Sequence, residues 1–370
     1  MRSPRSSSVA PMASTTNATG ELTPDQLERG SRTIALPGVG VDGQRRLRSA
    51  RVLVIGAGGL GSPALQYLAA AGVGTIGIVD FDTVDLSNLQ RQVIHAGAQI
   101  GEPKTRSAAR AIAALDPSVA TIQHQTMLSA ANALALFADY DVIVDGSDNF
   151  ATRYLAGDAA AILGKPYVWG SVLRFDGQVT VFWEGAPDGG SIDYRDLHPV
   201  PPEPGDVLSC GEAGVLGSVC GTIGSMMATE AIKLLTGIGR PLLGRVLVLD
   251  ALDAQWREVA VRRSPARVPV RELIDYEEFC GVERIDHDLE VDEVPDGWRL
   301  LDVREPYEHA RRHLDGDSLL PLGTLLADAG HVEGPVVVYC ASGMRSNRAA
   351  RALVAAGVEA RSLRGGIVGR

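Results

Sequence analysis

The sequence predicts an α/β protein: a doubly wound, mainly parallel sheet with an antiparallel extension, followed by a smaller α/β domain. Strand and helix patterns alternate between residues 51 and 164, which is typical of a parallel sheet. The first strand runs directly into a glycine turn, in the stretch "RVLVIGAGG". The chain has 370 residues, of which 45% are hydrophobic, enough for two or three domains with sizeable cores.

The chain is expected to start with a tail and a short helix. Residues 1–20 are rich in Ser, Thr, Ala and Pro, which predicts a disordered tail. The tail has arginines but no apolar segment, which argues against a secretory signal. Thr23 and Pro24 are typical of an N-cap and the first helical position. We therefore expect a short helix that carries Arg29 and Arg32.

The alternating region contains the strands and helices of the main sheet. Strands are expected within 51–59, 75–82, 121–126 and 141–149, and helices within 62–72, 103–117 and 151–164. Later strands within 178–183 and 245–252, with a helix at 224–237 between them, predict the antiparallel extension.

A change of composition near residues 262–283 divides the chain. We expect a tail at 1–20, a first domain at 21–262, a linker at 263–288 and a second domain at 289–370. The second domain shows its own α/β pattern, with segments at 299–305, 336–340, 345–357 and 360–366.

Charge and cysteine content exclude several classes of function. The net charge is -10 and no long basic run is present, so nucleic acid and anionic membranes are poor candidate partners. No apolar run approaches the roughly 18 residues of a membrane span. The four cysteines are scattered singly, which argues against a disulfide framework and fits a reducing cytoplasm.

The glycine turn predicts a nucleotide site. Gly56, Gly58 and Gly61 form G-x-G-x-x-G directly after a strand, and Asp80 closes the next strand 19 residues beyond Gly61. Glycines let the backbone approach phosphates, the following helix offers amide donors, and the acid binds a ribose hydroxyl. The alternative is a tight packing turn with a solvated Asp80.

Further polar residues follow the strands of this sheet and indicate which nucleotide binds. Arg91 lies in the polar stretch "DLSNLQRQVIH", Lys104 starts a helix, and Asp148 and Asn149 end a strand. Ligands of such sheets bind at the carboxyl ends of the strands. Two cations and a carboxylate there suit a triphosphate with Mg²⁺. An NAD-dependent oxidoreductase stays as an alternative, although a dinucleotide would not require these cations.

The segments 51–95, "GEPKTRSA" and "DGSDNFATRY" closely resemble the ubiquitin-activating-enzyme-like adenylyltransferases of bacteria. Within them, they are most similar to the molybdopterin-synthase and thiamine-biosynthesis adenylyltransferases. The resemblance spans about residues 22–262. It implies a Rossmann-like domain that binds ATP and adenylates the C-terminal glycine of a small ubiquitin-like sulfur carrier ending in Gly-Gly.

The resemblance also implies roles for individual residues. Gly59 would pack against the nucleotide, and Asp80 would hold the ribose. Lys104 would neutralise the phosphates, and Asp148 would bind Mg²⁺ with Asn149 beside it. The phosphates would be contacted by the segment Ser87, Asn88, Leu89, Gln90 and Arg91. Arg32 matches an arginine that the family inserts from the other subunit of a homodimer.

Two departures from that family concern cysteines. Many members hold a structural zinc with two C-x-x-C pairs, but here those positions read "DYRD" (193–196) and "SPARVP" (264–269). We therefore expect no zinc. Cys210 lies in "LSCGEAGVLG", where fused relatives can form a thioester with the carrier; the alternative is a loop thiol without required chemistry. Cys220 is expected to be a small core residue.

Cys340 is the candidate nucleophile of the second domain. It ends the apolar strand "VVVYC" and precedes a loop of small residues and an amphipathic helix. Backbone amides and the positive end of the helix dipole would stabilise a thiolate or persulfide there, and Arg345 adds a cation.

The second domain resembles a rhodanese from about residue 295 onward. "CASGMRS" matches the active-site loop, with Cys340 as persulfide carrier. In "LLDVREPYEHARRHLDGD", Asp302 and Arg304 match residues that tie this loop down. Rhodaneses usually continue past "GGI" into a final helix, so we expect a domain that is shortened and less stable.

Together these features predict a two-step enzyme. The first domain makes an acyl-adenylate of the carrier, and a Cys340 persulfide converts it to a thiocarboxylate, with a cysteine desulfurase or thiosulfate as sulfur donor. Two alternatives remain beside the oxidoreductase: an adenylyltransferase with an inactive rhodanese-like domain, and a non-catalytic scaffold that binds a ubiquitin-like partner.

Overall fold

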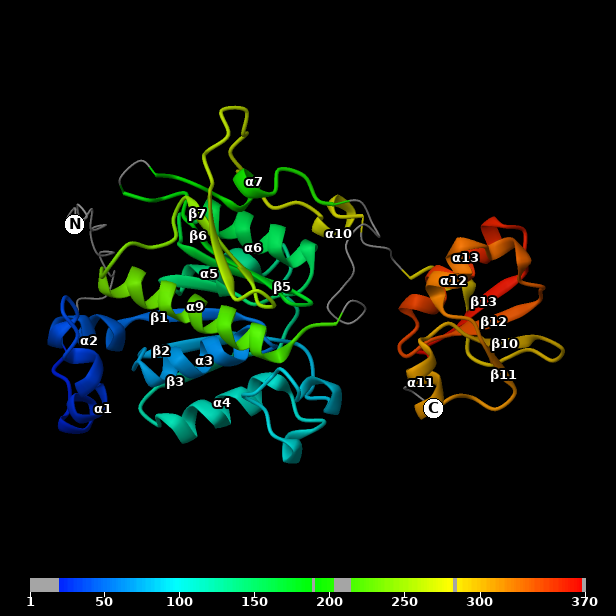
Figure 1. Ribbon diagram of the computed structural model, residues 1–370, viewed down its shortest axis with the longest axis horizontal. Helices are drawn as coiled ribbons and strands as arrows, with labels where there is room; N and C mark the ends of the chain where they lie inside the picture. Colours follow the sequence, from blue (N-terminus) through cyan, green and yellow to red (C-terminus); the bar gives the residue numbers. More distant parts are fainter. Residues whose placement is uncertain (1–19, 188–189, 203–213, 282–284, 368–370) are drawn as a thin grey trace. The chain divides into compact units, whose positions relative to one another are not determined.

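The computed structural model describes residues 20–187, 190–202, 214–281 and 285–367, in two units formed by residues 1–281 and 282–370 (Figure 1). The expected tail at 1–20 lies outside the described residues except for Gly20. Among the described residues, no helix combines the length and apolar character needed to cross a bilayer.

The first unit contains an eight-stranded sheet in the order β3-β2-β1-β4-β5-β6-β7-β8. Pairs from β3 to β5 are parallel, and pairs from β5 to β8 are antiparallel. The predicted parallel sheet and its antiparallel extension are therefore confirmed. The strands are β1 (Arg51–Ile55), β2 (Thr75–Val79), β3 (Ala120–His124), β4 (Val142–Asp145), β5 (Tyr167–Leu173), β6 (Asp176–Phe182), β7 (Arg245–Asp250) and β8 (Gln255–Ala260).

Helices cover both faces of this sheet because the buried strands are apolar on both sides. Along β1, Val52 and Val54 belong to the core cluster that includes α3, α4 and α9, whereas Leu53 and Ile55 belong to the cluster that includes α5 and α6. The helices are α1 (Pro24–Ile34), α2 (Gly40–Ser49), α3 (Gly61–Ala70), α4 (Lys104–Leu115), α5 (Ala133–Ala138), α6 (Phe150–Ile162), α7 (Tyr194–Leu197), α9 (Gly217–Thr236) and α10 (Tyr276–Phe279), with 3₁₀ turns η1 (Leu86–Asn88) and η2 (Gly97–Gln99).

The predicted N-terminal helix is α1, and its start follows from its sequence. The Thr23 hydroxyl accepts from the Gln26 amide at 3.3 Å, and the Gln26 side chain accepts from the Thr23 amide at 2.9 Å. This capping box satisfies two backbone donors that the helix itself leaves free.

The second unit contains a five-stranded parallel sheet in the order β11-β10-β12-β13-β9. Its strands are β9 (Glu290–Val291), β10 (Arg299–Asp302), β11 (Asp317–Leu319), β12 (Val336–Tyr339) and β13 (Ala360–Leu363). Its helices are α11 (Pro306–Arg311), α12 (Leu322–Ala327) and α13 (Met344–Ala355), with 3₁₀ turns η3 (His287–Leu289) and η4 (Ala329–His331). The smaller α/β domain predicted after the first is thereby confirmed.

The segment expected as a linker contributes to the first unit up to Gly281. Arg267 forms ion pairs with Asp193 and Asp196, and Tyr276 is buried beside α6, where its hydroxyl donates to Asp158 at 2.6 Å. The linker was predicted from a change of composition, which does not show these contacts, because Arg267 and Tyr276 are single residues within an otherwise polar stretch.

Candidate active sites

A cavity opens at the carboxyl ends of β1, β2 and β4 and encloses about 920 Å³, part of it open to solvent. Its position is the one expected for a ligand of a doubly wound sheet. Predicted site residues from five separate segments line it, namely Gly56, Gly58, Gly59, Asp80, Arg91, Lys104, Asp148 and Asn149. The structure therefore brings most of the predicted nucleotide site together.

The glycine turn has a separate steric reason for each of its key glycines. Gly56 has φ +83°, a backbone conformation that favours glycine. A Cβ on Gly61 would lie 1.8 Å from the carbonyl oxygen of Gly56, so Gly61 allows α3 to pack on the turn and is not among the lining residues. A Cβ on Gly59 would lie 3.0 Å from Cys220 Sγ.

Asp80 holds the glycine turn in place with both carboxylate oxygens. One oxygen accepts from the Ala57 amide at 2.8 Å and the other from the Asp82 amide at 2.9 Å. Burial raises the pKa of Asp80, and the charge of Lys104 acts against this rise. Asp80 thus fixes the turn while its carboxylate also lines the cavity.

Lys104 and Arg91, two of the cations that line the cavity, are held differently. Lys104 is buried at the start of α4, and its Nζ lies 2.9 Å from Asp82 Oδ2. Arg91 follows η1, and its Nη1 donates to the Ser87 carbonyl at 3.3 Å. Both side chains line the cavity, so both can meet an anionic ligand.

The segment from Ser87 to Gln90 has structural contacts of its own. The Ser87 hydroxyl donates to Asp85 at 2.6 Å, and the Asn88 side chain accepts from the Asp85 amide at 3.3 Å. Ser87, Asn88, Leu89 and Gln90 are not among the residues that line the cavity. They shape the turn that presents Arg91.

Asp148 and Asn149 differ in how they are engaged. Asn149 is the N-cap of α6, and its side-chain oxygen accepts from the Thr152 amide at 2.8 Å. Asp148 is exposed, and within the described part of the chain its carboxylate has no hydrogen-bond or ion-pair partner. Its oxygens are available to a cation, and carboxylate oxygen is a preferred ligand of Mg²⁺.

Sequence reasoning missed other residues of the cavity. Arg153 is buried, donates to the Ser147 carbonyl at 3.1 and 3.3 Å, and lies 5.7 Å from the Trp169 ring centroid. Its position one turn after Asn149 on α6 was the available signal. Cys220 is buried, as expected of a small core residue, and it also lines the cavity.

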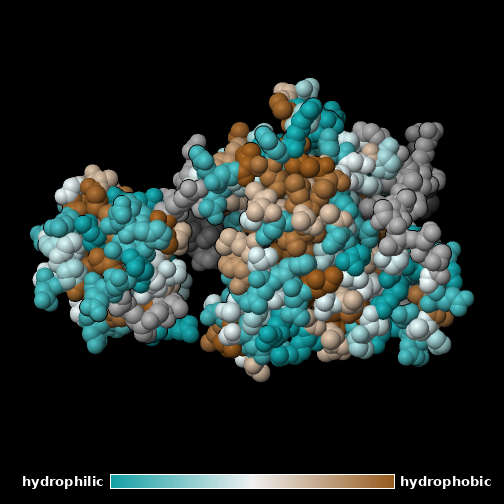
Figure 2. Space-filling view, turned by 180° about the vertical axis from the view of Figure 1, so that it is seen from behind, coloured by the Kyte–Doolittle hydropathy of each residue, from teal (hydrophilic) through white to brown (hydrophobic). Residues whose placement is uncertain are grey.

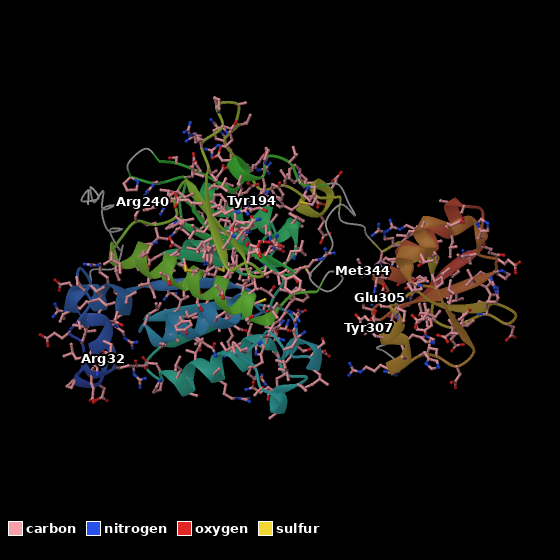
Figure 3. All side chains as sticks on the ribbon, in the orientation of Figure 1. Arg32, Tyr194, Arg240, Glu305, Tyr307 and Met344 are labelled. Atoms are coloured by element: carbon pink, nitrogen blue, oxygen red, sulfur yellow. The ribbon has the colours of Figure 1, made fainter. Side chains whose placement is uncertain are left out.

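Arg32 and Cys210 are not part of this cavity as described. Arg32 is an exposed residue of α1, at the edge of the first unit in Figure 3, and it is not among the lining residues. Cys210 lies outside the described residues.

A buried ion-pair network joins the two positions where the resemblance places zinc cysteines. Arg267 Nη1 lies 2.7 Å from Asp193 and 2.8 Å from Asp196, and Nη2 lies 2.7 Å from Glu184. The Ser264 amide also donates to Asp196 at 2.9 Å. A guanidinium thus already neutralises the carboxylates at this place, and the donor set does not fit a zinc ion, which prefers thiolate and imidazole ligands.

In the second unit, Cys340 lies at the end of β12 and is 1% exposed. The Gly343 amide donates to Cys340 Sγ at 3.1 Å, and Gly343 has φ +102°. At least one loop amide therefore faces the sulfur, as the sequence predicted. A backbone donor of this kind stabilises a negatively charged sulfur.

The charged residues around this loop form two pairs. Arg345 is bidentate to Glu308, with both distances 2.7 Å, and this pairing raises the pKa of Arg345. Arg304 binds Asp302 at 2.6 Å and the Arg312 carbonyl at 2.6 Å. The Asp302–Arg304 pair therefore anchors the end of α11, and its described bonds do not reach the Cys340 loop.

Two surface features lie in the same unit. Tyr307 and Met344 are 70% and 48% exposed, and Figure 3 places them with Glu305 on one side, where α11 and the start of α13 lie.

His309, His313 and Asp317 gather near α11, but the two imidazoles stack with planes 19° apart and so do not converge on one point.

Comparison with known proteins matches a family to each of the two units. The ThiF family matches residues 30–270, and the rhodanese-like domain matches residues 287–369. The probable adenylyltransferase/sulfurtransferase MoeZ of Mycobacterium tuberculosis is 50% identical over 381 residues, covering 98% of this chain and 96% of MoeZ. The sulfur carrier protein adenylyltransferase of Thermus thermophilus is 50% identical over 268 residues, covering 70% of this chain and 98% of that protein.

Solved structures support the fold of the first unit. Escherichia coli MccB in complex with MccA-N7isoASN superposes with a TM-score of 0.58 at 18% identity, covering 66% of this chain and 75% of MccB. At this identity the likeness concerns the fold alone.

The family matches and the relatives confirm the resemblance predicted from the sequence, and with it the predicted enzyme class of adenylyltransferase and sulfurtransferase. The chain belongs to the ThiF family and carries a rhodanese-like domain after its ThiF domain.

Proposed function

We propose that this chain adenylates the C-terminal glycine of a small ubiquitin-like sulfur carrier ending in Gly-Gly, and then converts that glycine to a thiocarboxylate with sulfur from a Cys340 persulfide. The observation that carries the proposal is the convergence of Gly58, Gly59, Arg91, Lys104 and Asp148 on one cavity, in a chain that also has a Cys340 loop with an amide aimed at the sulfur. The relative MoeZ is named for the same pair of activities.

In the first step, the cavity holds ATP. The glycine turn lets phosphates approach the backbone, Asp80 faces the ribose, and Arg91 and Lys104 face the phosphates. The ammonium group of Lys104 would then contact both the Asp82 carboxylate and the phosphates of the nucleotide. The exposed Asp148 would hold Mg²⁺, with Asn149 beside it, and the ion would neutralise phosphate charge.

The adenylation itself needs positioning and charge neutralisation more than proton transfer. The carrier carboxylate, which is ionised at neutral pH, attacks the α-phosphorus. A new C–O–P bond forms, the α–β phosphoanhydride bond breaks, and pyrophosphate leaves. Both reactants are anions, so Arg91 and Lys104 lower the barrier by offsetting their repulsion and the charge that develops.

In the second step, the terminal sulfur of the Cys340 persulfide attacks the acyl carbon, and AMP leaves. The product is an acyl disulfide on Cys340. A thiol then attacks the Cys340 sulfur, which releases the thiocarboxylate and leaves a mixed disulfide. We propose Cys210 as a candidate for that thiol. A second thiol, from a low-molecular-weight thiol reductant, then cleaves the mixed disulfide and frees the Cys340 thiol. Thiosulfate, with loss of sulfite, or a cysteine desulfurase reloads that thiol. Tyr307 and Met344 offer an apolar surface near the loop for the carrier.

The remaining parts of the proposal concern assembly and location. Figure 2 shows a broad hydrophobic area on one face of the first unit, and such areas mark protein interfaces. We propose a homodimer in which Arg32 of one subunit completes the cavity of the other. We also propose a cytoplasmic enzyme without zinc that binds neither nucleic acid nor membrane, and that serves a molybdopterin, thiamine, cysteine or tRNA-thiolation type of pathway.

The test is an incubation with ATP, Mg²⁺ and a panel of carriers ending in Gly-Gly, with and without thiosulfate. Carrier-dependent pyrophosphate release together with a sulfur-for-oxygen mass gain supports both steps. Pyrophosphate release without the mass gain favours the second candidate, an adenylyltransferase whose rhodanese-like domain is inactive. No pyrophosphate with any carrier contradicts the proposal.

A further inference from the structure

His95 is a buried residue that the proposed mechanism does not use. It ends the polar stretch that starts at Asp85, and it is 8% exposed. Its two ring nitrogens contact two segments that each carry residues of the cavity lining. Nε2 lies 2.9 Å from the carbonyl oxygen of Ala57, in the glycine turn, and Nδ1 lies 2.7 Å from the hydroxyl of Ser107, on α4.

The chemistry of these partners fixes the tautomer of His95. A carbonyl oxygen can only accept, so Nε2 carries the proton and donates to Ala57. Burial lowers the pKa of His95, which favours the neutral ring. In the neutral ring Nδ1 is an acceptor. The Ser107 hydroxyl therefore donates its one proton to Nδ1, because two acceptors would otherwise face each other at 2.7 Å. The same hydroxyl also lies 2.7 Å from Gln99 Oε1.

The peptide groups on the two sides of Ala57 are held from two directions. Its amide donates to Asp80 at 2.8 Å, and its carbonyl accepts from His95 at 2.9 Å. Ala57 lies between Gly56 and Gly58, which line the cavity. Because the amide and the carbonyl of Ala57 are both hydrogen-bonded, the peptide groups that join it to Gly56 and Gly58 are fixed. The Gly58 amide is therefore kept in one orientation.

Together with further contacts, these hydrogen bonds form a closed network of interactions beside the cavity. Asp80 accepts from the Asp82 amide, Asp82 binds Lys104 through its carboxylate and its carbonyl, and Lys104 lies one turn before Ser107 on α4. Ser107 leads back to His95. His95 thus adds a second link, beside that through Asp80 and Asp82, between the glycine turn and the helix that carries Lys104.

We propose that His95 is a positioning residue for the triphosphate of ATP: its neutral ring fixes the glycine turn relative to Lys104, so that backbone amides and the ammonium group meet the phosphates together. This inference rests on the proposed function, because it assumes that the glycine turn receives the phosphates. It assigns no contact between His95 and the nucleotide.

The test compares ATP and adenosine binding by calorimetry in the full chain. His95→Leu removes the donor to Ala57, whereas His95→Gln keeps an N–H at a similar reach. We expect His95→Leu to weaken ATP binding at least tenfold more than adenosine binding, and His95→Gln to restore ATP binding to within threefold of the unmodified chain. His124→Leu is the matched control, since His124 is a part-buried histidine whose Nε2 contacts the Tyr140 hydroxyl at 2.9 Å; it should not change the ATP-to-adenosine ratio.

The outcomes separate this inference from the proposed function. An unmodified chain that does not bind ATP overturns both. An unmodified chain that binds ATP, with His95→Leu unchanged or with equal losses for ATP and adenosine, overturns the positioning role alone. If His95→Leu does not fold, Ser107→Ala takes its place. Ser107→Ala removes the contact between His95 and α4 but keeps the hydrogen bond from His95 to the Ala57 carbonyl. We then expect a smaller ATP-specific loss, and no loss contradicts the inference.

Discussion

Arg267 Nη1 donates to Asp196 Oδ2 at 2.8 Å across 71 residues of sequence. The Arg267 side chain is 4% exposed and that of Asp196 is 0% exposed, so the pair is cut off from water. Because the same guanidinium also holds Asp193 and Glu184, it cross-links the segment after β8 to the segment after β6. Removing one partner of a buried pair leaves an uncompensated charge.

We therefore expect Arg267→Met to lower the free energy of unfolding of the first unit by on the order of 3 kcal/mol. Urea unfolding followed by tryptophan fluorescence measures this loss. Arg263→Met is the matched control, because Arg263 contacts the same Glu184 at 3.3 Å but its side chain is 46% exposed. An exposed pair contributes about 0–1 kcal/mol. Equal, small losses in both variants would show that the network does not hold the fold together.

Lys104→Met tests the phosphate side of the cavity. It removes a buried cation that lines the site, so we expect carrier-dependent pyrophosphate release to fall by about 100-fold or more. Persulfide formation on Cys340 from thiosulfate should not change, since it needs no nucleotide. Arg110→Ala is the control: Arg110 is an exposed cation of the same helix, paired with Glu102 at 2.9 Å. Normal adenylation by Lys104→Met would refute the assignment of Lys104 to the phosphates.

Cys340→Ala separates the two steps. It removes the sulfur that accepts from Gly343 and leaves the nucleotide cavity untouched, so pyrophosphate release should persist while the carrier gains no sulfur. A pyrophosphate assay measures the first quantity, and mass spectrometry of the carrier measures the second. Cys280→Ala serves as the control, because burial raises the pKa of this second thiol to about 11 and leaves it protonated at neutral pH. Thiocarboxylate formation by Cys340→Ala would rule out the proposed role of Cys340.

Arg32→Ala tests whether the cavity is shared between subunits. The variant alone should lose adenylation, as should Arg91→Ala alone. A mixed dimer of the two has one cavity with Arg91 from its own subunit and Arg32 from the other, so about half of the activity should return. Without this recovery on mixing, although mixed dimers form, Arg32 would have no role in the partner's site.

The sequence predicted the parallel strands β1 to β4, and β1, β2 and β4 are short apolar runs next to a helix and a turn. It missed β8, whose residues are all exposed and which pairs with β7 without any buried face of its own. It also missed β5, where Gly170 and Ser171 interrupt the apolar pattern. Edge position and tertiary packing decide such strands, and neither is visible in local composition.

The sequence predicted which residues line the cavity where a residue's position follows from the end of a strand. Asp80 follows the end of β2, Asp148 follows the end of β4, and Lys104 starts α4. All three residues line the cavity. The contacts among them could not be predicted, because they depend on long-range geometry. The Asp82–Lys104 pair and the two bonds to Ala57 are of this kind.

His198 gives the first unit a pH dependence whose sign follows from burial. Burial, followed by the charge of Arg153, lowers the pKa of His198 to about 4, against an ordinary value of 6.5. Above pH 6.5 neither the folded nor the unfolded chain protonates this ring. Between pH 6.5 and about 4, His198 is protonated in the unfolded chain but stays neutral in the folded chain. The free energy of unfolding should therefore fall as pH is lowered through this window.

Urea unfolding of the first unit at several pH values between 7.5 and 4 tests this expectation. His198→Gln should flatten the decline without abolishing it, because burial also lowers the pKa of His95 and His124. His331→Gln is the control, since His331 belongs to the second unit and its pairing with Asp328 raises its pKa, which is the opposite sign. An identical decline in His198→Gln and the unmodified chain would mean that His198 accepts its proton in the folded protein as readily as in water.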